Sequence, residues 1–243
     1  VRSLRRAIEA DDRIAFVDNT PGVGLLWDGE AVTGVEVMQG GERTAVAAHH
    51  VVLASDGFAA NERMIRDFIP EAVDDVFQGV STSTGDALEW AIALGAATRN
   101  MTSFLGSGMV VPGYATRVNP SLPFRGALLV DMQGRRFVDE HEHGYSSLAT
   151  VLRTLPQRKA VLIWDDTVHE PSLASELMRE SERAGAFRQY PDASALCAHL
   201  GLPEPALTET LADFVGWDEV TGNRLSLHAP YWAAPLTAGI LAT

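Results

Sequence analysis

The chain has 243 residues, of which 46% are hydrophobic, and a formal net charge of -13 from 19 Lys and Arg against 32 Asp and Glu. This apolar content is ample for a packed core and excludes a disordered or low-complexity protein. The acidic balance argues against nucleic acid or an anionic membrane as the main partner, since both attract clustered positive charge. The single Cys197 cannot form an internal disulfide. No apolar run approaches the roughly 18 residues that span a bilayer, and with no visible secretory leader we expect a cytoplasmic protein.

The first hundred residues predict short strands between helices. Apolar residues at helical spacing favour a helix over 2–10. Turn residues then break the chain into short strands typical of an antiparallel meander, which we expect at 14–17, 24–27, 31–38 and 43–48. Two further helices are expected, one over 62–68 that Pro70 stops and one that begins at Gly85 and Asp86.

The stretch Val51–Asn61 (Val-Val-Leu-Ala-Ser-Asp-Gly-Phe-Ala-Ala-Asn) is the best candidate for a ligand site. It begins as an apolar, β-branched run and ends abruptly in small residues, which is typical of a buried parallel strand that stops beside a ligand. Ligands of open α/β sheets lie beyond the carboxyl ends of the strands, so Ala54, Ser55 and Gly57 would allow close approach. A core strand followed by an ordinary turn is the competing interpretation.

The second half of the chain changes in texture at about Met101. Irregular chain rich in Gly and Pro gives way to strands expected at 127–130 and 160–164 and to helices expected at 172–187, 193–199 and 207–214. We therefore expect one domain from residues 1–100 with 226–243, and a second from 101–225.

Several segments in a common order resemble FAD-dependent oxidoreductases of the fumarate reductase, succinate dehydrogenase and 3-ketosteroid dehydrogenase superfamily. The segments are Val51–Asn61, Asn19–Leu26 (Asn-Thr-Pro-Gly-Val-Gly-Leu-Leu), Val32–Val37 (Val-Thr-Gly-Val-Glu-Val), Thr84–Leu88 (Thr-Gly-Asp-Ala-Leu), Leu94–Ala96 (Leu-Gly-Ala), Gly126–Val130 (Gly-Ala-Leu-Leu-Val), Gly134–Glu140 (Gly-Arg-Arg-Phe-Val-Asp-Glu), Leu207–Phe214 and Pro230–Gly239. No single motif is decisive, but their order and spacing together are. The segments cover nearly the whole chain.

The resemblance implies an α/β fold with an α+β cap. The first domain would be a partial Rossmann-like FAD-binding domain carrying the antiparallel meander, and residues 101–225 would be an inserted capping domain that closes over the flavin. The family opens with a Gly-x-Gly-x-x-Gly turn. Gly22–Gly24 is the nearby candidate here, but Pro21 precedes it and a strand-like run follows, so we favour a hairpin turn. We interpret the chain as an internal part of a longer flavoprotein.

The resemblance also implies FAD as the cofactor. The positions expected to contact it are Gly22, Ala54, Ser55, Gly57, Gly85 and Asp86. Asp86 has a second interpretation as a helix N-cap, whatever the function. Asp56 stands where the family has Gly, and its carboxylate would repel an FAD phosphate.

The substrate implied by the resemblance is a small molecule other than a dicarboxylate. Where the dicarboxylate members have a His, a Glu-x-x-Arg pair and a catalytic Arg, this chain has Ser107, Pro120, Pro123 and Gly144. Two substrate carboxylates need charge-assisted partners, which are gone here. The family's last His positions are also replaced, by Leu241 and Ala242.

Tyr145, Tyr231 and Arg125 remain near the inferred site, and they resemble the ketosteroid dehydrogenase branch, in which tyrosines act as base and as donor to the substrate carbonyl. We therefore expect α,β-dehydrogenation of an apolar carbonyl compound, or the reverse reduction. Tyr145 lies one residue out of register and has an alternative role at an interface. Two alternatives stay open: a polycarboxylate dehydrogenase or reductase of the tricarballylate or fumarate type, and a flavoprotein fragment without activity.

Glu140–His143 (Glu-His-Glu-His) has residue types that bind metals. Alternating positions on an extended segment would place the carboxylates on one face and the imidazoles on the other, so we do not expect a metal site.

Overall fold

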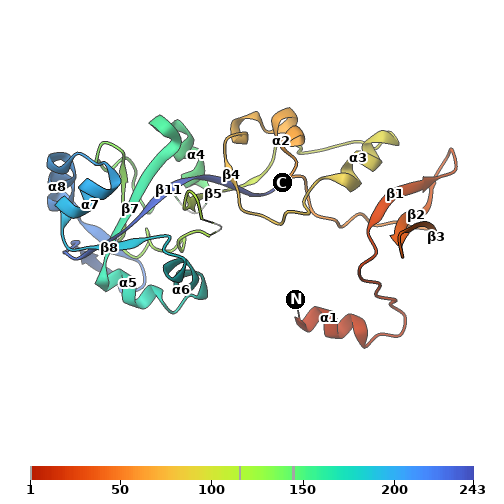
Figure 1. Ribbon diagram of the computed structural model, residues 1–243, viewed down its shortest axis with the longest axis horizontal. Coiled ribbons are helices and arrows are strands. Elements are labelled where there is room, and N and C mark those ends of the chain that lie inside the picture. The colour runs from red at the N-terminus through yellow and green to blue at the C-terminus, as the bar shows by residue number, and fades with distance from the viewer. Residues whose placement is uncertain (1, 115, 144–145) are drawn as a thin grey trace. The chain divides into compact units, whose positions relative to one another are not determined.

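The computed structural model describes residues 2–114, 116–143 and 146–243 (Figure 1). The chain divides into two compact units. The first, which we call the meander unit, comprises Val1–Asp56 and Gly85–Arg99. The second, which we call the core unit, comprises Gly57–Thr84 and Asn100–Thr243. The boundaries at residues 100, 101, 225 and 226 that the sequence suggests stay a prediction.

The meander unit contains a three-stranded antiparallel sheet and two helices. Its elements are α1 (Arg2–Glu9), β1 (Gly22–Trp27), β2 (Val32–Gln39), β3 (Glu42–Ala47) and α3 (Asp86–Ala93). The strand order is β1-β2-β3, with antiparallel pairing at both contacts, so the predicted meander is confirmed. Gly22 is the first residue of β1, before a register irregularity at Gly24, which corrects the expected hairpin turn.

Two expected strands of the meander unit do not form. Residues 14–17 and 51–54 have no β-structure, and Val52 and Leu53 are 85% and 43% exposed. A buried parallel strand needs a neighbouring strand and cover on both faces. The described residues of the meander unit offer this segment no hydrogen-bonded strand, so its apolar sequence remains an extended surface segment.

The core unit is organised around one long strand. Its six-stranded sheet consists of β4 (Val76–Phe77), β5 (Leu105–Val110), β6 (Leu128–Asp131), β7 (Lys159–Asp165), β8 (Arg188–Tyr190) and β11 (Tyr231–Ala242). β11 pairs with β4 in parallel, and with β5, β7 and β8 antiparallel, while β6 pairs with the far edge of β7. A short antiparallel hairpin, β9 (Gly216–Asp218) and β10 (Asn223–Leu225), forms a separate sheet.

Eight short helical segments complete the core unit among the described residues. They are α2 (Glu62–Phe68), the 3₁₀ turn η1 (Pro70–Ala72), α4 (Ser147–Thr154), the 3₁₀ turn η2 (Pro156–Arg158), α5 (Asp166–Ser172), α6 (Glu176–Arg183), α7 (Ala193–Leu200) and α8 (Glu204–Asp213). The bounds of α2 match the prediction, because the Asn61 side chain accepts a hydrogen bond from the Met64 N–H (3.1 Å) and Pro70 follows. The single helix expected at 172–187 is wrong, since turns at 173–175 separate α5 from α6.

Alternating residues of the central strands build apolar clusters on both faces of the sheet. Leu129, Leu162 and Trp164 belong to the cluster that α4, α5 and α6 cover, and Val161 and Ile163 belong to the cluster that α7 and α8 cover. This alternation is the two-residue period of a strand with both faces buried. The mixed α/β fold that the sequence predicts is therefore confirmed.

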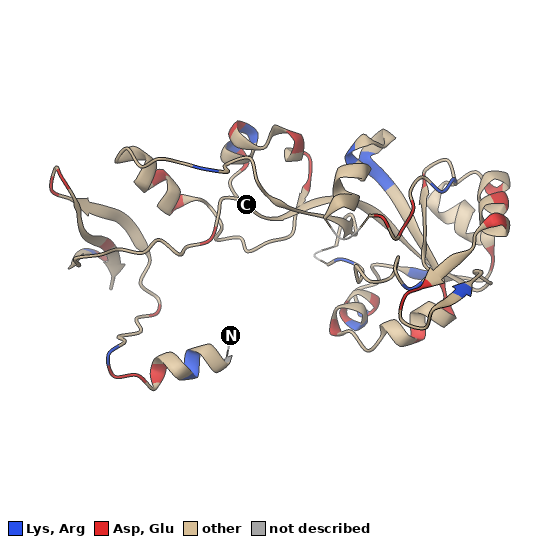
Figure 2. Cartoon of the chain, turned by 180° about the vertical axis from the view of Figure 1, so that it is seen from behind, with Lys and Arg blue, Asp and Glu red and all other residues tan. Residues whose placement is uncertain are grey.

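Charged residues of both signs are interleaved along the elements of each unit (Figure 2). On α6, for example, Arg179 and Arg183 both pair with Glu176, with an Arg183 Nη2–Glu176 Oε1 distance of 2.9 Å for the second pair. None of the described helices is long and apolar enough to cross a membrane.

Candidate functional site

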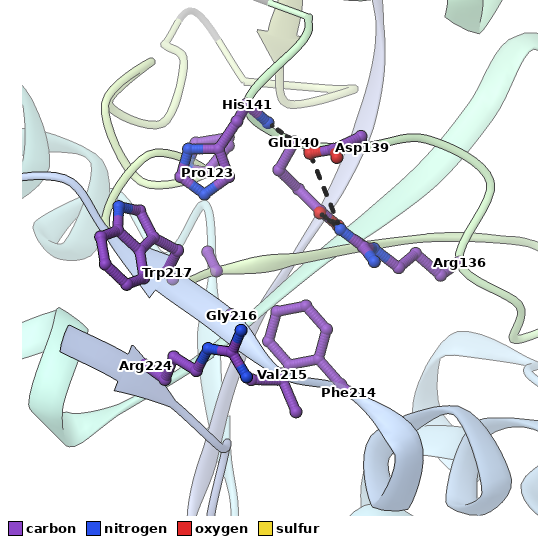
Figure 3. A pocket seen from close by; sticks show the side chains of 12 residues that line it. Pro123, Arg136, Asp139, Glu140, His141, Phe214, Val215, Gly216, Trp217 and Arg224 are labelled. Atoms are coloured by element: carbon purple, nitrogen blue, oxygen red, sulfur yellow. Dashed lines mark hydrogen bonds and ion pairs between the residues drawn. The ribbon is translucent and has the colours of Figure 1, made fainter. Parts of the chain in front are cut away.

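A pocket of about 340 Å³ lies in the core unit (Figure 3). Its lining combines aromatic rings, arginines, carboxylates and an imidazole, contributed by Pro123, Gly126, Ala127, Arg136, Asp139, Glu140, His141, Phe214, Val215, Gly216, Trp217 and Arg224. The residues come from three segments: the loop before β6, the loop after it, and, far along the chain, the stretch from the end of α8 through the β9–β10 hairpin. We refer to this cavity as the cap pocket.

The β9–β10 hairpin contributes a tryptophan and an arginine from one face. Trp217 and Arg224 are directly opposite each other in the antiparallel register, so their side chains project from the same face. The hairpin is held to the loop before β6 by an N–H···O bond from Glu219 to the Phe124 carbonyl (3.0 Å) and by the Arg125–Asp218 ion pair (Nε–Oδ1 2.9 Å). These two contacts fix the hairpin wall of the pocket against the loop before β6.

A buried ion pair closes another wall. Glu140 is 2% exposed, and its carboxylate accepts hydrogen bonds from the Arg136 Nε (3.0 Å to Oε2) and from the Leu129 N–H (3.0 Å to Oε1). The Glu140 charge raises the pKa of Arg136 through the hydrogen bond and the Coulomb attraction. The Arg136 charge is thus already neutralised by the protein, which leaves this guanidinium little capacity for a ligand anion.

His141 directly follows this ion pair and is oriented by two carboxylates. The Asp139 side chain accepts a hydrogen bond from the His141 backbone N–H (3.0 Å), which fixes the turn. The His141 Nδ1 lies 3.0 Å from Glu219 Oε1, and its ring meets the edge of Phe124 at a centroid distance of 6.0 Å. Because a carboxylate accepts hydrogen bonds, it favours a proton on Nδ1 and leaves Nε2 as the atom for proton exchange.

Arg224 is the arginine of the pocket lining that is available to pair with a ligand anion. Arg125 pairs with Asp218 and Arg136 pairs with Glu140, whereas no carboxylate within ion-pair distance of Arg224 is found among the described residues. The side chain is on the exposed part of β10 and reaches the pocket beside Phe214 and Gly216 (Figure 3). The cap pocket therefore has aromatic surface, one unneutralised guanidinium, and a histidine–carboxylate pair.

Of the three residues predicted to be catalytic, the two that the structure describes, Tyr231 and Arg125, do not line the cap pocket. Tyr145 lies outside the described residues. Tyr231 begins β11, where it pairs with Asp165 on β7 and with Tyr190 on β8, and it packs against the cluster under α7 and α8. Burial and the Asp165 charge raise the pKa of Tyr231, so its hydroxyl stays protonated at neutral pH. Arg125 is bound to Asp218 behind the hairpin.

The four positions at which the resemblance places the polar groups of dicarboxylate enzymes can be compared with the structure. Ser107 is fully buried in β5, and its hydroxyl accepts a hydrogen bond from the Met109 N–H (3.3 Å). Pro123 lines the cap pocket with its ring, and Pro120 precedes it in the same loop. Gly144 lies outside the described residues.

Four of the positions expected to contact the cofactor lie in two parts of the meander unit: the end of the extended segment and the start of α3. Ala54 and Ser55 are exposed at the end of the extended segment. Gly85, with φ of 78°, is the N-cap of α3 and supplies no side-chain hydrogen bond, so the first amides of this helix are free of a side-chain cap. Asp86 is the first helical residue rather than the expected N-cap, and its exposed carboxylate lies in the first turn.

One of the expected cofactor glycines, Gly57, has a packing explanation within the chain. A Cβ at Gly57 would lie 2.3 Å from both the carbonyl and the hydroxyl oxygen of Thr243, and the Phe58 N–H donates to that hydroxyl (2.7 Å). Gly57 therefore lets the end of β11 pack closely. A Cβ at Gly22 would lie 3.4 Å from the Trp90 ring of α3, which is an ordinary van der Waals contact, so packing does not require glycine there.

Sequence reasoning missed His141 and Arg224. His141 was considered only as a metal ligand, and the described residues contain no group of three His, Cys, Asp or Glu that could hold a metal ion. Its position directly after the Arg-Phe-Val-Asp-Glu motif was the available signal. Arg224 carried no signal, because its role depends on cross-strand pairing in a hairpin of three-residue strands.

Comparison with known proteins identifies the family. A model described as "FAD binding domain" matches residues 1–217, so the chain belongs to this family of FAD-binding domains. FAD is the cofactor of the family, as the sequence predicted.

Curated relatives and a solved structure agree with this assignment. The chain is 26% identical over 220 residues to the NADH:fumarate oxidoreductase of Klebsiella pneumoniae (strain 342), covering 88% of this chain and 23% of the relative. It is 27% identical over 230 residues to the NADH:acrylate oxidoreductase of Vibrio harveyi, covering 86% and 21%. The fold is similar to that of 3-ketosteroid delta1-dehydrogenase from Sterolibacterium denitrificans, with a TM-score of 0.78, 20% identity, and coverage of 99% and 51%.

Proposed function

We propose that this chain is part of an FAD-dependent oxidoreductase that interconverts a carbon–carbon single and double bond next to a carbonyl group. The observation that carries the proposal is the cap pocket, in which the His141–Glu219 pair (Nδ1–Oε1 3.0 Å) adjoins aromatic walls within a member of a FAD-binding family. The chain spans about a fifth to a quarter of the two curated relatives described above, so the activity is proposed for the protein to which it contributes. A cytoplasmic location stays a prediction.

Residues of the meander unit fit the cofactor in part. The amides at the start of α3, which the N-cap Gly85 does not cap with a side chain, suit an electronegative group of a nucleotide, and the exposed Asp86 carboxylate suits a hydroxyl donor. Ala54 and Ser55 leave room for close approach. Asp56 is exposed with φ of 68°, and its charge favours a ligand hydroxyl over a phosphate at that point. We propose Ala54, Ser55, Gly85 and Asp86 as the cofactor contacts from this unit.

FAD, when bound, would supply the two-electron exchange with the substrate carbon. The residues of the cap pocket would do the rest: Phe214 and Trp217 hold an apolar substrate body and keep water away, and His141 Nε2 releases a proton to the neighbouring carbon during reduction or removes it during dehydrogenation. Glu219 keeps the imidazole in the orientation and tautomer for that transfer.

The substrate class we propose is a mainly apolar carbonyl compound. A dicarboxylate needs cationic partners for both ends, and two of the three arginines around the cap pocket are already paired with Asp218 and Glu140. Tyr231 keeps its proton because its pKa is raised, but it does not line the cap pocket, so a role as proton donor would belong to a site other than this pocket. We propose Arg125 as a residue that positions the hairpin.

A polycarboxylate of the fumarate type is the second candidate. The relative named as an NADH:fumarate oxidoreductase supports it. This candidate needs cationic groups from outside the cap pocket to pair with the second substrate carboxylate. Turnover of a mixture of an apolar carbonyl compound and fumarate distinguishes the two candidates by which substrate is consumed. Neither class is excluded by the family assignment.

The test is a single-turnover experiment with the flavin-loaded protein, in which bleaching or recovery of the flavin absorbance follows transfer. His141→Gln removes the transferable proton and should slow turnover by roughly 10²- to 10⁴-fold, the usual contribution of a general acid or base. His228→Gln is the matched control, because His228 is exposed and does not line the pocket. An unchanged rate in the His141 variant would contradict the assigned role, and an absence of bound flavin would contradict the function itself.

A further inference from the structure

We propose that Arg224 is a specificity-determining residue that binds the single carboxylate of a substrate whose remaining body is flat and apolar. This inference rests on the proposed function and narrows its substrate from a carbonyl compound to an unsaturated monocarboxylate. The feature that points to it is the pairing of Arg224 with Trp217 across the β9–β10 hairpin, because both residues then line the cap pocket from the same face of the hairpin (Figure 3).

The charges around the pocket accommodate one anionic group and disfavour a second. Among the described residues, Arg224 is the lining arginine without a carboxylate partner, since Arg136 is held by Glu140. The lining also includes the carboxylates of Asp139 and Glu140, and Glu219 lies behind the lining residue His141, with its Oε1 3.0 Å from His141 Nδ1. A first ligand carboxylate can form a charge-assisted pair with Arg224, whereas a second would meet carboxylates of the protein.

The shape of the wall favours a flat body. Phe214 follows α8, and Trp217 lies in β9. Between them, the backbone at Gly216 packs closely on its neighbours, because a Cβ there would lie 2.9 Å from the Phe214 ring and 3.2 Å from the Gly126 Cα. The exposed Trp217 indole offers contact area and stacking to a planar unsaturated ligand, whereas Phe214 is 4% exposed and has the Arg136 guanidinium over its ring at 5.6 Å. Trp217 is 42% exposed, so ligand that covers it displaces water and changes its fluorescence.

Three probes of related chemistry separate the elements of the proposal. trans-Cinnamate joins a phenyl ring, a conjugated double bond and one carboxylate; benzylideneacetone replaces the carboxylate by an uncharged methyl ketone; fumarate replaces the ring by a second carboxylate. Each is titrated into the full chain without added flavin while the tryptophan fluorescence is recorded. Trp217→Phe identifies the part of the signal that comes from the pocket. We expect cinnamate to bind most tightly and fumarate most weakly.

Arg224→Gln should weaken cinnamate binding by roughly tenfold, which is the low end for a charge-assisted hydrogen bond at an exposed position, and should leave benzylideneacetone binding within about twofold. Arg224→Lys keeps the charge and should retain part of the affinity. Arg188→Gln is the matched control, because Arg188 is an exposed arginine of β8 that does not line the pocket.

The inference is overturned if cinnamate affinity is the same in the wild-type chain and in Arg224→Gln, if fumarate binds as tightly as cinnamate, or if no probe changes the Trp217 signal. Flavin-dependent turnover that persists in any of these cases leaves the proposed function standing and removes only the role of Arg224. Cinnamate binding that depends on Arg224 in a protein that never holds flavin supports the pocket and contradicts the proposed function.

Discussion

The two units differ in how much apolar surface they bury by themselves. In the core unit, alternating residues of β6, β7 and β11 pack into two clusters, and Leu162 and Trp164 are fully buried. In the meander unit, the buried hydrophobic side chains among the described residues are those of Val37 and Ala87, while Val52 is 85% exposed. Because burial of apolar surface is the main stabilising contribution to folding, we expect the core unit to gain more stability from its own side chains than the meander unit does.

Matched leucine truncations test this difference most strongly. Leu162→Ala removes a side chain that is 0% exposed and should lower the free energy of unfolding by about 2–5 kcal/mol, because it leaves a cavity in the core unit. Leu53→Ala removes a side chain that is 43% exposed and should cost less than about 1 kcal/mol. Urea unfolding followed by circular dichroism measures both. Equal losses in the two variants would contradict the comparison.

Matched ion-pair deletions test it at a smaller scale. Glu140→Gln removes one partner of the pair with Arg136, in which the Glu140 side chain is 3% exposed, and should lower stability by about 1–3 kcal/mol. The same change at Glu36, which pairs with Arg43 on the meander sheet at side-chain exposures of 31% and 66%, should cost less than about 1 kcal/mol. A loss at Glu36 that equals the loss at Glu140 would show that burial does not separate these pairs.

The smallest expected effect is a pH dependence of the core unit. His169 is 4% exposed, stacks on Trp232 at 3.7 Å, and its Nδ1 accepts a hydrogen bond from the Trp164 Nε1 (3.3 Å). Burial lowers the pKa of His169 below 6.5, and Glu182, whose Oε1 is 3.3 Å from Nε2, partly offsets the shift. The unfolded state therefore binds a proton first as pH falls, so stability is full above 6.5 and decreases below it.

His169→Phe provides the control for this pH dependence, since phenylalanine retains an aromatic ring but cannot be protonated. Urea midpoints at pH 7.5 and pH 5.5 should differ less in the variant than in the wild-type chain. A pH dependence that is the same in both proteins would assign it to other groups.

Local signals in the sequence predicted the elements whose causes are local. α2 has its predicted bounds because Asn61 caps it and Pro70 follows, and the meander strands follow from turn residues such as Gly40 and Gly41. The extended segment at Val52 was mispredicted because an apolar run specifies a strand only when another strand pairs with it. The break between α5 and α6 was missed because the polar and apolar pattern continues through it.

The candidate site could be predicted only in part, for a related reason. The Arg-Phe-Val-Asp-Glu motif, which the sequence singles out by resemblance, supplies one wall of the cap pocket, where Arg136 and Glu140 pair across four residues. Trp217 and Arg224 become neighbours through the register of a hairpin. Phe124 and Glu219 meet through one backbone hydrogen bond across nearly a hundred residues. Pairing of this kind cannot be read from spacing along the chain.

The central claim is that the meander unit contacts the flavin while the cap pocket of the core unit contacts the substrate. The most direct test is the dissociation constant of FAD, measured by its visible absorbance, for Asp86→Asn and Arg224→Gln in the flavin-binding protein. We expect Asp86→Asn to weaken FAD binding by roughly threefold to tenfold, because a neutral acceptor replaces a charged one, and Arg224→Gln to leave it unchanged. Weaker FAD binding in Arg224→Gln with normal binding in Asp86→Asn would contradict this division of roles.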